Sequence, residues 1–341
     1  MAAMIMVTMM LLLLFQQFNV NQIVALRHNH PHHDVVDAIN RSGGPYIGLV
    51  MAYPGEEVVL QASGLFVPNS DIPLVLLSGR RYNVGTISGV DVIYVMTGEK
   101  TVNAGVAVQI LLDAFDIIGV VHYGIAGSTN DSLLIGDVAV LNYVAFTNSW
   151  DWEGLGSDSR EELPQLSFGD FDLPQKGNNS LANVEFVPVQ LFSIGKLMEQ
   201  LFWLPIDSSW FNISTQLQEL ELQQCQNETY CLTNKPKVAF GLRGATADVF
   251  LNNEAYRNFL FKEFNISTAD EESAAVVMTA LSNNVPSIVF RGVSDMAGAE
   301  EESSKQSTTL IWSSLAAVNA LRVAVAFIEL IGKGNPRIEP L

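Results

Sequence analysis

Short apolar segments rich in β-branched residues recur along the chain, and this repetition most limits the folds it can adopt. Each segment is bounded by Gly, Pro, Asn or Asp, as strands commonly are. Between the third and fourth, residues 102–116 have helical spacing. The expected buried face of this helix carries Val106, Ile110, Leu111 and Phe115. Near-continuous apolar strands separated by helices predict a sheet buried on both sides, hence an α/β fold. The expected strands are 46–52, 73–79, 90–98, 117–124, 138–146, 237–242 and 285–295.

Residues 150–236 interrupt this pattern, because they are rich in Asn, Ser, Asp, Gln and Pro. We expect a surface insertion there, with one helix over 191–204. Helices are also predicted over 271–281 and 308–331, the latter apolar enough to suggest a membrane span. That segment contains three side chains that are costly in a bilayer, Asn319, Arg322 and Glu329. We therefore expect it to be a closing helix packed on the sheet.

The amino-terminal segment has the features of an export signal. Residues 4–15 form an unbroken apolar run, too short to span a bilayer and followed by polar residues. We predict a signal peptide over 1–25 and a flexible tail over 26–45, with ordered structure beginning near Tyr46. The His-rich tract at 28–33 falls in that tail, so no metal site is predicted. A short carboxyl-terminal tail is expected over 334–341.

Potential glycosylation sites agree with export. The chain has Asn-x-Ser/Thr sequons at Asn40, Asn130, Asn178, Asn212, Asn227 and Asn265. Its two cysteines, Cys225 and Cys231, flank one of them, and an oxidising compartment would let them form a disulfide. Such a bond would hold a local turn and would not organise the fold. We therefore expect a secretory protein that resides in the vacuole or outside the cell.

The charge balance excludes one class of partner. Asp and Glu number 36 against 18 Lys and Arg, so the formal net charge is -18. A nucleic-acid footprint needs basic surface, and this composition does not supply it. After signal removal, no membrane association is expected either.

Polar residues gather at the carboxyl ends of the predicted strands, where open α/β sheets bind ligands. They lie in 52–57, 97–105, 122–128 and 290–295, the last preceded by the helix at 271–281. Each cluster alone has a structural explanation as turn glycines, a charged first helical turn or a helix cap. Their combination and order indicate a ligand site.

The same residues resemble the nucleoside phosphorylase and methylthioadenosine/S-adenosylhomocysteine nucleosidase superfamily over 46–333. The resemblance rests most on a Glu helix, an NVP turn and an RxxSD end. These motifs comprise Glu272, Asn284, Val285, Pro286, Arg291, Ser294 and Asp295. The HYG-x-AGS turn and the leader are similar to the plant branch of bark and vegetative storage proteins. The resemblance implies a three-layer fold, with a central mixed sheet flanked by helices.

The resemblance also implies roles in cleaving an N-glycosidic bond. Asp295 matches the acid that protonates the purine N7, with Ser294 beside it, a task that requires a raised pKa. Glu272 matches the residue that accepts hydrogen bonds from the ribose and stabilises its developing positive charge. Phe250 matches the aromatic residue that stacks on the base. Backbone groups around Ala126 and Gly127 would line the same pocket.

The identity of the nucleophile stays open at this point. Nucleosidases use water activated by a carboxylate after the first strand, here Glu56 or Glu57. Phosphorylases bind phosphate at two glycine-containing turns, which correspond to Gly55 and to Gly98 with Lys100. The arginine expected after the first turn is absent, and two glutamates beside it would repel a dianion. Inorganic phosphate is thus an alternative co-substrate, and no other cofactor is predicted.

Three functions follow from this reading. The first is an exported nitrogen-storage protein on a nucleoside-cleaving fold. The second is an active purine-nucleoside phosphorylase or nucleosidase, acting on adenosine-type or cytokinin ribosides. The third is a nucleoside-binding protein without turnover. A purine nucleoside or base is the expected ligand, and the resemblance implies a homo-oligomer.

Overall fold

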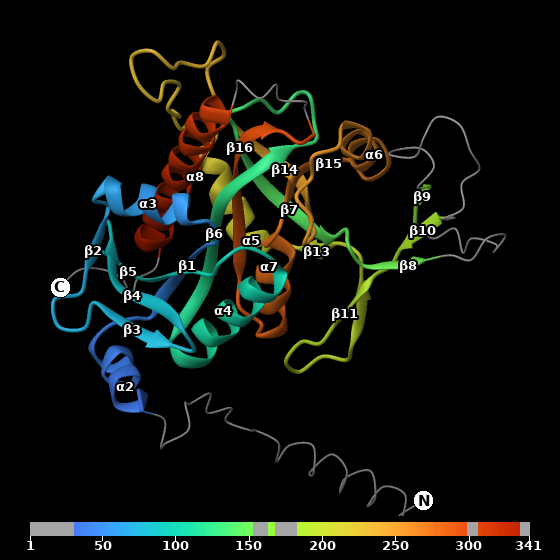
Figure 1. The fold of residues 1–341 in the computed structure, drawn as a ribbon. Coiled ribbons are helices and arrows are strands. Elements are labelled where there is room, and N and C mark those ends of the chain that lie inside the picture. Colours follow the sequence, from blue (N-terminus) through green and yellow to red (C-terminus); the bar gives the residue numbers. More distant parts are fainter. Residues whose placement is uncertain (1–30, 153–162, 168–182, 299–305, 335–341) are drawn as a thin grey trace, which may run out of the picture.

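A large mixed sheet organises the chain (Figure 1). The structure is a computed structural model that describes residues 31–152, 163–167, 183–298 and 306–334. The strands of the sheet are β1 (Tyr46–Met51), β2 (Phe66–Pro68), β3 (Leu74–Leu77), β4 (Arg80–Ile87), β5 (Val90–Met96), β6 (Ile117–Ser128), β7 (Val138–Phe146), β13 (Leu204–Pro205), β14 (Val238–Thr246), β15 (Ile266–Asp270) and β16 (Ser287–Met296). They lie in the order β13-β7-β14-β15-β6-β1-β5-β4-β2, with β16 pairing β6 and β7, and β3 pairing β4.

The centre of the sheet is parallel and fully covered. Strand β1 pairs with β5 and β6 in parallel, and β6 pairs with β16 in parallel. All six residues of β1 are buried, as expected for a parallel strand with both faces covered. Because these strands run the same way, their carboxyl ends meet at one edge of the sheet. That edge carries the polar clusters identified in the sequence.

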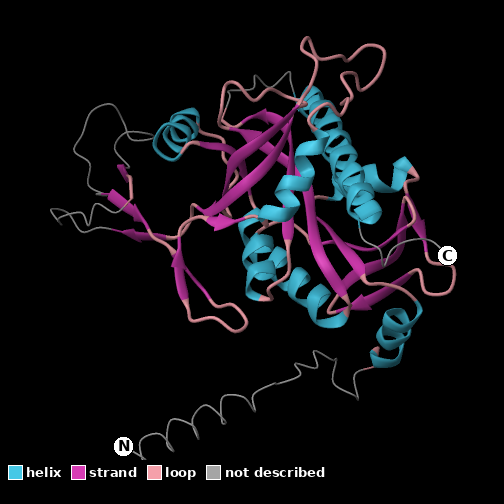
Figure 2. Ribbon diagram, turned by 180° about the vertical axis from the view of Figure 1, so that it is seen from behind, coloured by secondary structure: helices cyan, strands magenta, loops and turns pink. Residues whose placement is uncertain are grey.

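Helices lie on both faces of the sheet, which gives the three-layer arrangement (Figure 2). The helices are α2 (His33–Ser42), α3 (Pro54–Ser63), α4 (Thr101–Ala114), α5 (Ser208–Ser214), α6 (Glu254–Phe264), α7 (Ser273–Ser282) and α8 (Gln306–Gly334), with a short 3-10 turn η2 (Thr215–Leu217). Helices α3, α5 and α8 pack in one hydrophobic core and α2 and α4 in a second, and α7 contributes to both. Helix α6 packs in a third, smaller core. The predicted α/β class with a central mixed sheet is confirmed.

Helix α8 packs on the sheet as predicted for the closing helix. Its segment Leu310–Lys333 is long and apolar enough to cross a membrane, yet 67% of its most apolar window is buried inside the protein. The buried Asn319 amide donates to the carbonyls of Gly136 and Gln223, both at 2.9 Å. Gly292 on β16 allows the close approach, because a Cβ there would meet the backbone of Ala316.

The segment at 150–236 is only partly the surface insertion that we expected. Strands β8 (Trp150–Trp152), β9 (Gln165–Ser167) and β10 (Asn183–Phe186) form a small separate sheet that projects from the main one (Figure 1). The part from β13 to η2 instead belongs to the core. Leu204 is fully buried, and the ring of Trp210 lies 5.3 Å from that of Phe327 on α8.

The helix predicted over 191–204 is wrong. That stretch forms the hairpin of β11 (Val189–Leu191) and β12 (Glu199–Leu201), followed by β13. Gly195 has φ of 76° in its turn, and Lys196 N–H donates to the Ser193 carbonyl at 3.1 Å. A left-handed glycine in the middle of an apolar run ends any helix and favours the turn.

Two further expectations need correction. The predicted tail over 26–45 contains helix α2, whose Val36 and Ile39 are buried against the sheet's second core. On the predicted buried face of α4, Leu111 and Phe115 are buried and Ile110 is partly buried, whereas Val106 is 42% exposed. The buried residues of α4 also include three alanines, Ala104, Ala107 and Ala114, together with Val108. Residues 1–30 and 335–341, with the predicted signal peptide and most of the carboxyl-terminal tail, lie outside the described part of the chain.

The predicted disulfide between Cys225 and Cys231 is confirmed. It closes the loop that carries Asn227, whose side-chain oxygen accepts from the backbone N–H of Thr229 and Tyr230. Asn227 is exposed, as are Asn212 and Asn265. The Asn40 and Asn130 amides instead donate within the protein, to the Ala114 carbonyl and to Ser267 Oγ. Asn178 lies outside the described residues.

Candidate active site

A cavity of about 300 Å³ lies at the carboxyl ends of β1, β6, β14, β15 and β16. Its walls combine apolar side chains with a group of carboxyl groups. These carboxyl groups belong to Glu56, Glu99, Asp270, Glu271, Glu272 and Asp295. Among the described residues that line the cavity, none is Lys, Arg or His. The site is therefore suited to a neutral or positively charged ligand and repels an anion.

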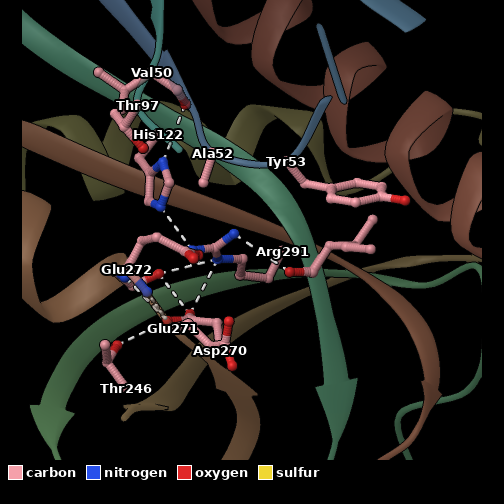
Figure 3. A network of polar contacts seen from close by, with 12 residues as sticks. Val50, Ala52, Tyr53, Thr97, His122, Thr246, Asp270, Glu271, Glu272 and Arg291 are labelled. Carbon is pink, nitrogen blue, oxygen red and sulfur yellow. Dashed lines mark hydrogen bonds and ion pairs between the residues drawn. The ribbon is translucent and has the colours of Figure 1, made fainter. Parts of the chain in front are cut away.

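Arg291 on β16 is fully buried. Its guanidinium lies between the His122 ring and the carboxyl groups of Asp270 and Glu272 (Figure 3). Its Nε lies 3.0 Å from Asp270 Oδ2, and its Nη2 lies 3.3 Å from Glu272 Oε2. Nε also donates to Ser273 Oγ at 2.9 Å. Removing a guanidinium from water is costly unless each of its donors finds a partner. Nη1 donates to the Ile125 carbonyl at 3.3 Å, so each nitrogen of the guanidinium has a partner. Arg291 thereby fixes two carboxylates at the base of the cavity.

The HYG turn supports the same arginine. His122 Nε2 lies 2.6 Å from Arg291 Nη2, and His122 Nδ1 lies 3.0 Å from the Val50 carbonyl. Because a guanidinium can only donate, Nε2 accepts and Nδ1 carries the proton. Burial and the Arg291 charge lower the pKa of His122 to about 3, so the imidazole is neutral. Gly124 leaves the space in which Arg291 and Glu56 meet, since a Cβ there would strike both side chains.

Glu56 lies at the cavity, whereas Glu57 does not. Glu56 Oε2 accepts from the N–H groups of Ala52 and Tyr53 at 2.9 and 3.0 Å, and its Oε1 accepts from Ile125 N–H at 2.8 Å. Glu57 points away and pairs with Arg81 Nη2 at 2.6 Å. Burial raises the pKa of Glu56, against the opposing effects of Arg291 and the backbone donors. Between the two carboxylates left open by the sequence, the geometry selects Glu56.

Glu272 and Asp270 lie at the start of α7. Asp270 Oδ1 accepts from Ser273 N–H at 2.9 Å, and Thr246 Oγ1 donates to the same oxygen at 2.7 Å. Burial alone would raise the pKa of Asp270, but Arg291 and these hydrogen bonds outweigh it and lower the value. For Glu272 burial wins, and its pKa rises to about 7 although Arg291 opposes the change. The Glu272 carboxyl group, which was predicted to bind the ribose, therefore changes its protonation state near neutral pH.

Asp295 and Ser294 lie across the cavity at the end of β16. Ser294 Oγ lies 2.7 Å from Asp295 Oδ2 and 3.3 Å from the Ala126 carbonyl. The register between β16 and β6 shifts between Val293 and Asp295, which brings Asp295 opposite Gly127. A Cβ on Gly127 would lie 3.1 Å from Asp295 Oδ1, so glycine leaves room for the carboxyl group. The structure therefore brings together four of the predicted site residues at the cavity, namely Ala126, Gly127, Ser294 and Asp295.

Phe250 lies at the rim of the cavity, 74% exposed, in the loop after β14. The same loop is attached to α4, although the two are far apart in sequence. Asp248 accepts from Thr101 N–H at 2.7 Å and from Thr101 Oγ1 at 2.8 Å. This carboxylate caps α4, whose own preceding residue, Lys100, provides no side-chain cap.

The predicted phosphate residues are not assembled at the cavity. Gly55 is the second residue of α3, and Gly98 has φ of 81° in the turn before α4. The Lys100 ammonium is paired with Glu271, and its backbone N–H donates to Glu272 Oε1 at 3.2 Å. None of these three residues lines the cavity within the described chain.

Four residues of the site received no role from the sequence. Arg291 belongs to the RxxSD motif and His122 to the HYG turn, so these motifs were the sequence signal that could have identified the two residues. Asp270 accepts from Ser273 N–H three residues later, a local signal that was not used, whereas Asp248 carried no local signal because its partner is distant in the sequence. Asp248 and Thr101 are separated by 147 positions in the sequence.

Comparison with known proteins agrees with this fold. A family model of the phosphorylase superfamily matches residues 46–329. Bark storage proteins A and B of Populus deltoides are 41% and 40% identical over 287 residues, covering 84% of this chain and 88% of each relative. The structure of a 5'-methylthioadenosine/S-adenosylhomocysteine nucleosidase from Colwellia psychrerythraea 34H, in complex with adenine, superposes with a TM-score of 0.59. It is 21% identical and covers 84% of this chain and 95% of its own. The chain belongs to the phosphorylase superfamily, as its motifs predicted.

Proposed function

We propose that this member of the phosphorylase superfamily is an exported storage protein. The observation that carries the proposal is its 41% identity to a poplar bark storage protein over most of both chains. An apolar leader and six sequons support export, and the acidic net charge of -18 supports solubility at high concentration. Vacuole or extracellular space is the proposed destination.

Storage has a direct test in the source tissue. The protein's share of total protein is measured by quantitative mass spectrometry under nitrogen surplus and again after nitrogen withdrawal. A reserve accumulates in the first condition and is depleted ahead of total protein in the second. A level that stays constant across both conditions would contradict storage.

The cavity supports a second function, cleavage of the N-glycosidic bond of a purine nucleoside. In this proposal Asp295 protonates the leaving base, Glu272 holds the ribose hydroxyls and Glu56 faces the sugar from the opposite wall. Phe250, at the rim of the cavity, stacks on the base, and backbone groups at Gly127 contact its edge. The proposal of nucleoside cleavage rests on one observation: these three carboxyl groups lie together around one cavity of about 300 Å³.

The acidic walls suit the charge that develops in this reaction. Breaking the bond leaves positive charge on the ribosyl group. One carboxylate about 4 Å from a unit positive charge stabilises it by about 4 kcal/mol at an effective dielectric constant of about 20. That energy corresponds to roughly a thousandfold in rate if the interaction forms only in the transition state.

Purified protein incubated with adenosine, methylthioadenosine and isopentenyladenosine tests this second function, with free base measured by chromatography. We expect base release by the unmodified chain and by Glu57→Gln, the matched control whose carboxylate faces away. Asp295→Asn and Glu56→Gln should lose about a hundredfold or more, the usual worth of an acid or base. Absence of free base from all substrates would refute cleavage and leave storage standing alone.

A further inference from the structure

Glu99 and Tyr53 line the cavity, yet neither side chain has a role in the proposed cleavage. Glu99 lies in the turn before α4 and is exposed. Tyr53 lies between β1 and α3 and is 38% exposed. Both side chains are therefore available to a part of the ligand that the proposed reaction leaves unassigned.

The Glu99 carboxylate carries a charge that the described residues do not offset. Its backbone carbonyl accepts from the Asn103 amide at 2.8 Å, but no hydrogen bond or ion pair engages its carboxylate within the described chain. Two cations reach this turn, and both are engaged elsewhere. The Lys100 ammonium is paired with Glu271, and Arg80 donates to Asn103 Oδ1 at 3.0 Å. Neither cation lines the cavity, so the wall at Glu99 attracts a positive charge and repels a negative one.

The Tyr53 ring is a second feature of the cavity wall, independent of the carboxylate charge. The ring lies over Gly55, where a Cβ would come within 2.6 Å of Tyr53 Cε1, so glycine leaves the space that the ring needs. Figure 3 shows this ring outside the network of polar contacts around Arg291. The face of an aromatic ring is negative and attracts ammonium groups. An aromatic face and a carboxylate on one cavity both favour an organic cation.

The proposed binding mode leaves one position of the nucleoside for these two side chains. The base, at C1′, is contacted by Phe250 and Asp295, and Glu272 holds the 2′ and 3′ hydroxyls. Among the carbons of the ribose, only C5′ then carries a substituent without an assigned partner. A protonated amine at C5′ would gain both an ion pair and an aromatic contact.

We propose that the cavity selects a purine nucleoside with a positively charged 5′ substituent, and that Glu99 and Tyr53 are specificity-determining residues for it, an inference that rests on the proposed nucleoside cleavage. The residues that act on the glycosidic bond keep the roles given above, and no covalent step is added. A neutral 5′ substituent gains no ion pair with Glu99. A 5′ carboxylate is repelled by it.

Three adenosine analogues of similar size test this selection, because they differ in the charge of the 5′ group. At pH 7, 5′-amino-5′-deoxyadenosine is a cation, adenosine is neutral and adenosine 5′-carboxylic acid is an anion. Their affinities for the full chain are measured by calorimetry at low and at high salt. The variants are Glu99→Gln, Tyr53→Leu and the conservative Tyr53→Phe. Asp71→Asn, an exposed carboxylate that does not line the cavity, controls for net charge.

We expect the unmodified chain and Asp71→Asn to bind the amine more tightly than adenosine, and adenosine more tightly than the acid. Glu99→Gln should lower the ratio of amine affinity to adenosine affinity by about fivefold, the effect of one unit charge at about 4 Å in bulk water. High salt should lower the same ratio in the unmodified chain. Tyr53→Leu should lower it by about two- to fivefold, and Tyr53→Phe should keep it. Adenosine affinity serves as the internal reference for folding of each variant.

Equal affinities for the amine and adenosine in the unmodified chain would overturn the inference. So would a ratio that Glu99→Gln leaves unchanged. Cleavage is scored separately, by chromatography of free adenine. If adenosine is bound but not cleaved, the proposed reaction fails, and the affinity ratios still decide whether the cavity selects a cation. If none of the three analogues binds, both the selection and the proposed cleavage are refuted.

Discussion

Replacing Arg291 with Met is the sharpest test of how the site is held together. The guanidinium is fully buried and contacts Asp270 and Glu272 at 3.0 and 3.3 Å. Removing one partner of a buried ion pair leaves an uncompensated charge and typically costs about 3–5 kcal/mol. We expect Arg291→Met to lower the free energy of unfolding at pH 7 by that amount.

The loss of unfolding free energy caused by Arg291→Met should depend on pH, and the structure determines whether it grows or shrinks as pH rises. Arg291 helps to lower the pKa of Asp270 in the folded protein, so this carboxylate adds stability above its unfolded pKa. Without Arg291, burial raises the pKa values of Asp270 and Glu272, and the folded state binds more protons than the unfolded state. Stability then falls as pH rises through this range. The loss caused by Arg291→Met should be larger at pH 7 than at pH 5.

Urea unfolding at pH 5 and pH 7, followed by circular dichroism, measures both effects. The matched control is Lys235→Met, which removes an exposed pair with Glu221 at 3.2 Å. Such surface pairs contribute little. A loss for Arg291→Met no larger than for Lys235→Met would refute the reasoning, as would a loss that grows toward pH 5.

Three other measurements test separate parts of the structure. Trp210→Ala should cost about 3–5 kcal/mol in urea unfolding if the segment is core, whereas Trp152→Ala, 61% exposed, should stay within about 0.5 kcal/mol. Gly124→Ala places a methyl group against Arg291 and should cost about 1–3 kcal/mol by the same assay; an unchanged midpoint would contradict the packing. Because the pKa of Glu272 is about 7, adenosine affinity measured by calorimetry should rise from pH 6 to 8, when the carboxylate can accept from the ribose. In a Glu272→Gln variant, the adenosine affinity should not change between pH 6 and pH 8.

The sequence predicted the strands best where burial on both faces left little choice of residue. Strand β1 is buried throughout, and its apolar run was sufficient to identify it. Strand β4 was missed, because it begins with Arg80 and Arg81 and alternates polar with apolar residues. The hairpin at 189–201 was mistaken for a helix, since apolar residues there satisfy either period and only Gly195 marks the turn.

The site was predictable to the extent that local motifs define it. Asp295, Ser294 and Glu272 were identified from their motifs, yet neighbouring Glu56 and Glu57 could not be separated. Adjacent helical residues point about 100° apart, and only the folded chain shows which one meets the strand ends. Asp248 was beyond reach, because its role depends on a contact between distant segments.

The buried cluster around Arg291 has a cost that nitrogen storage does not require. Asp270 and Glu272 are 9% and 6% exposed, so all three charged groups give up hydration on folding. Apolar replacement of such clusters is often neutral or stabilising by about 1–4 kcal/mol. A reserve protein needs to fold, dissolve and be degraded, and none of these tasks needs charge in its interior. A site for a ribosyl cation does need fixed carboxylates, with one kept near its pKa at neutral pH. The cluster therefore favours ligand chemistry inside the same chain whose similarity to bark storage proteins favours storage.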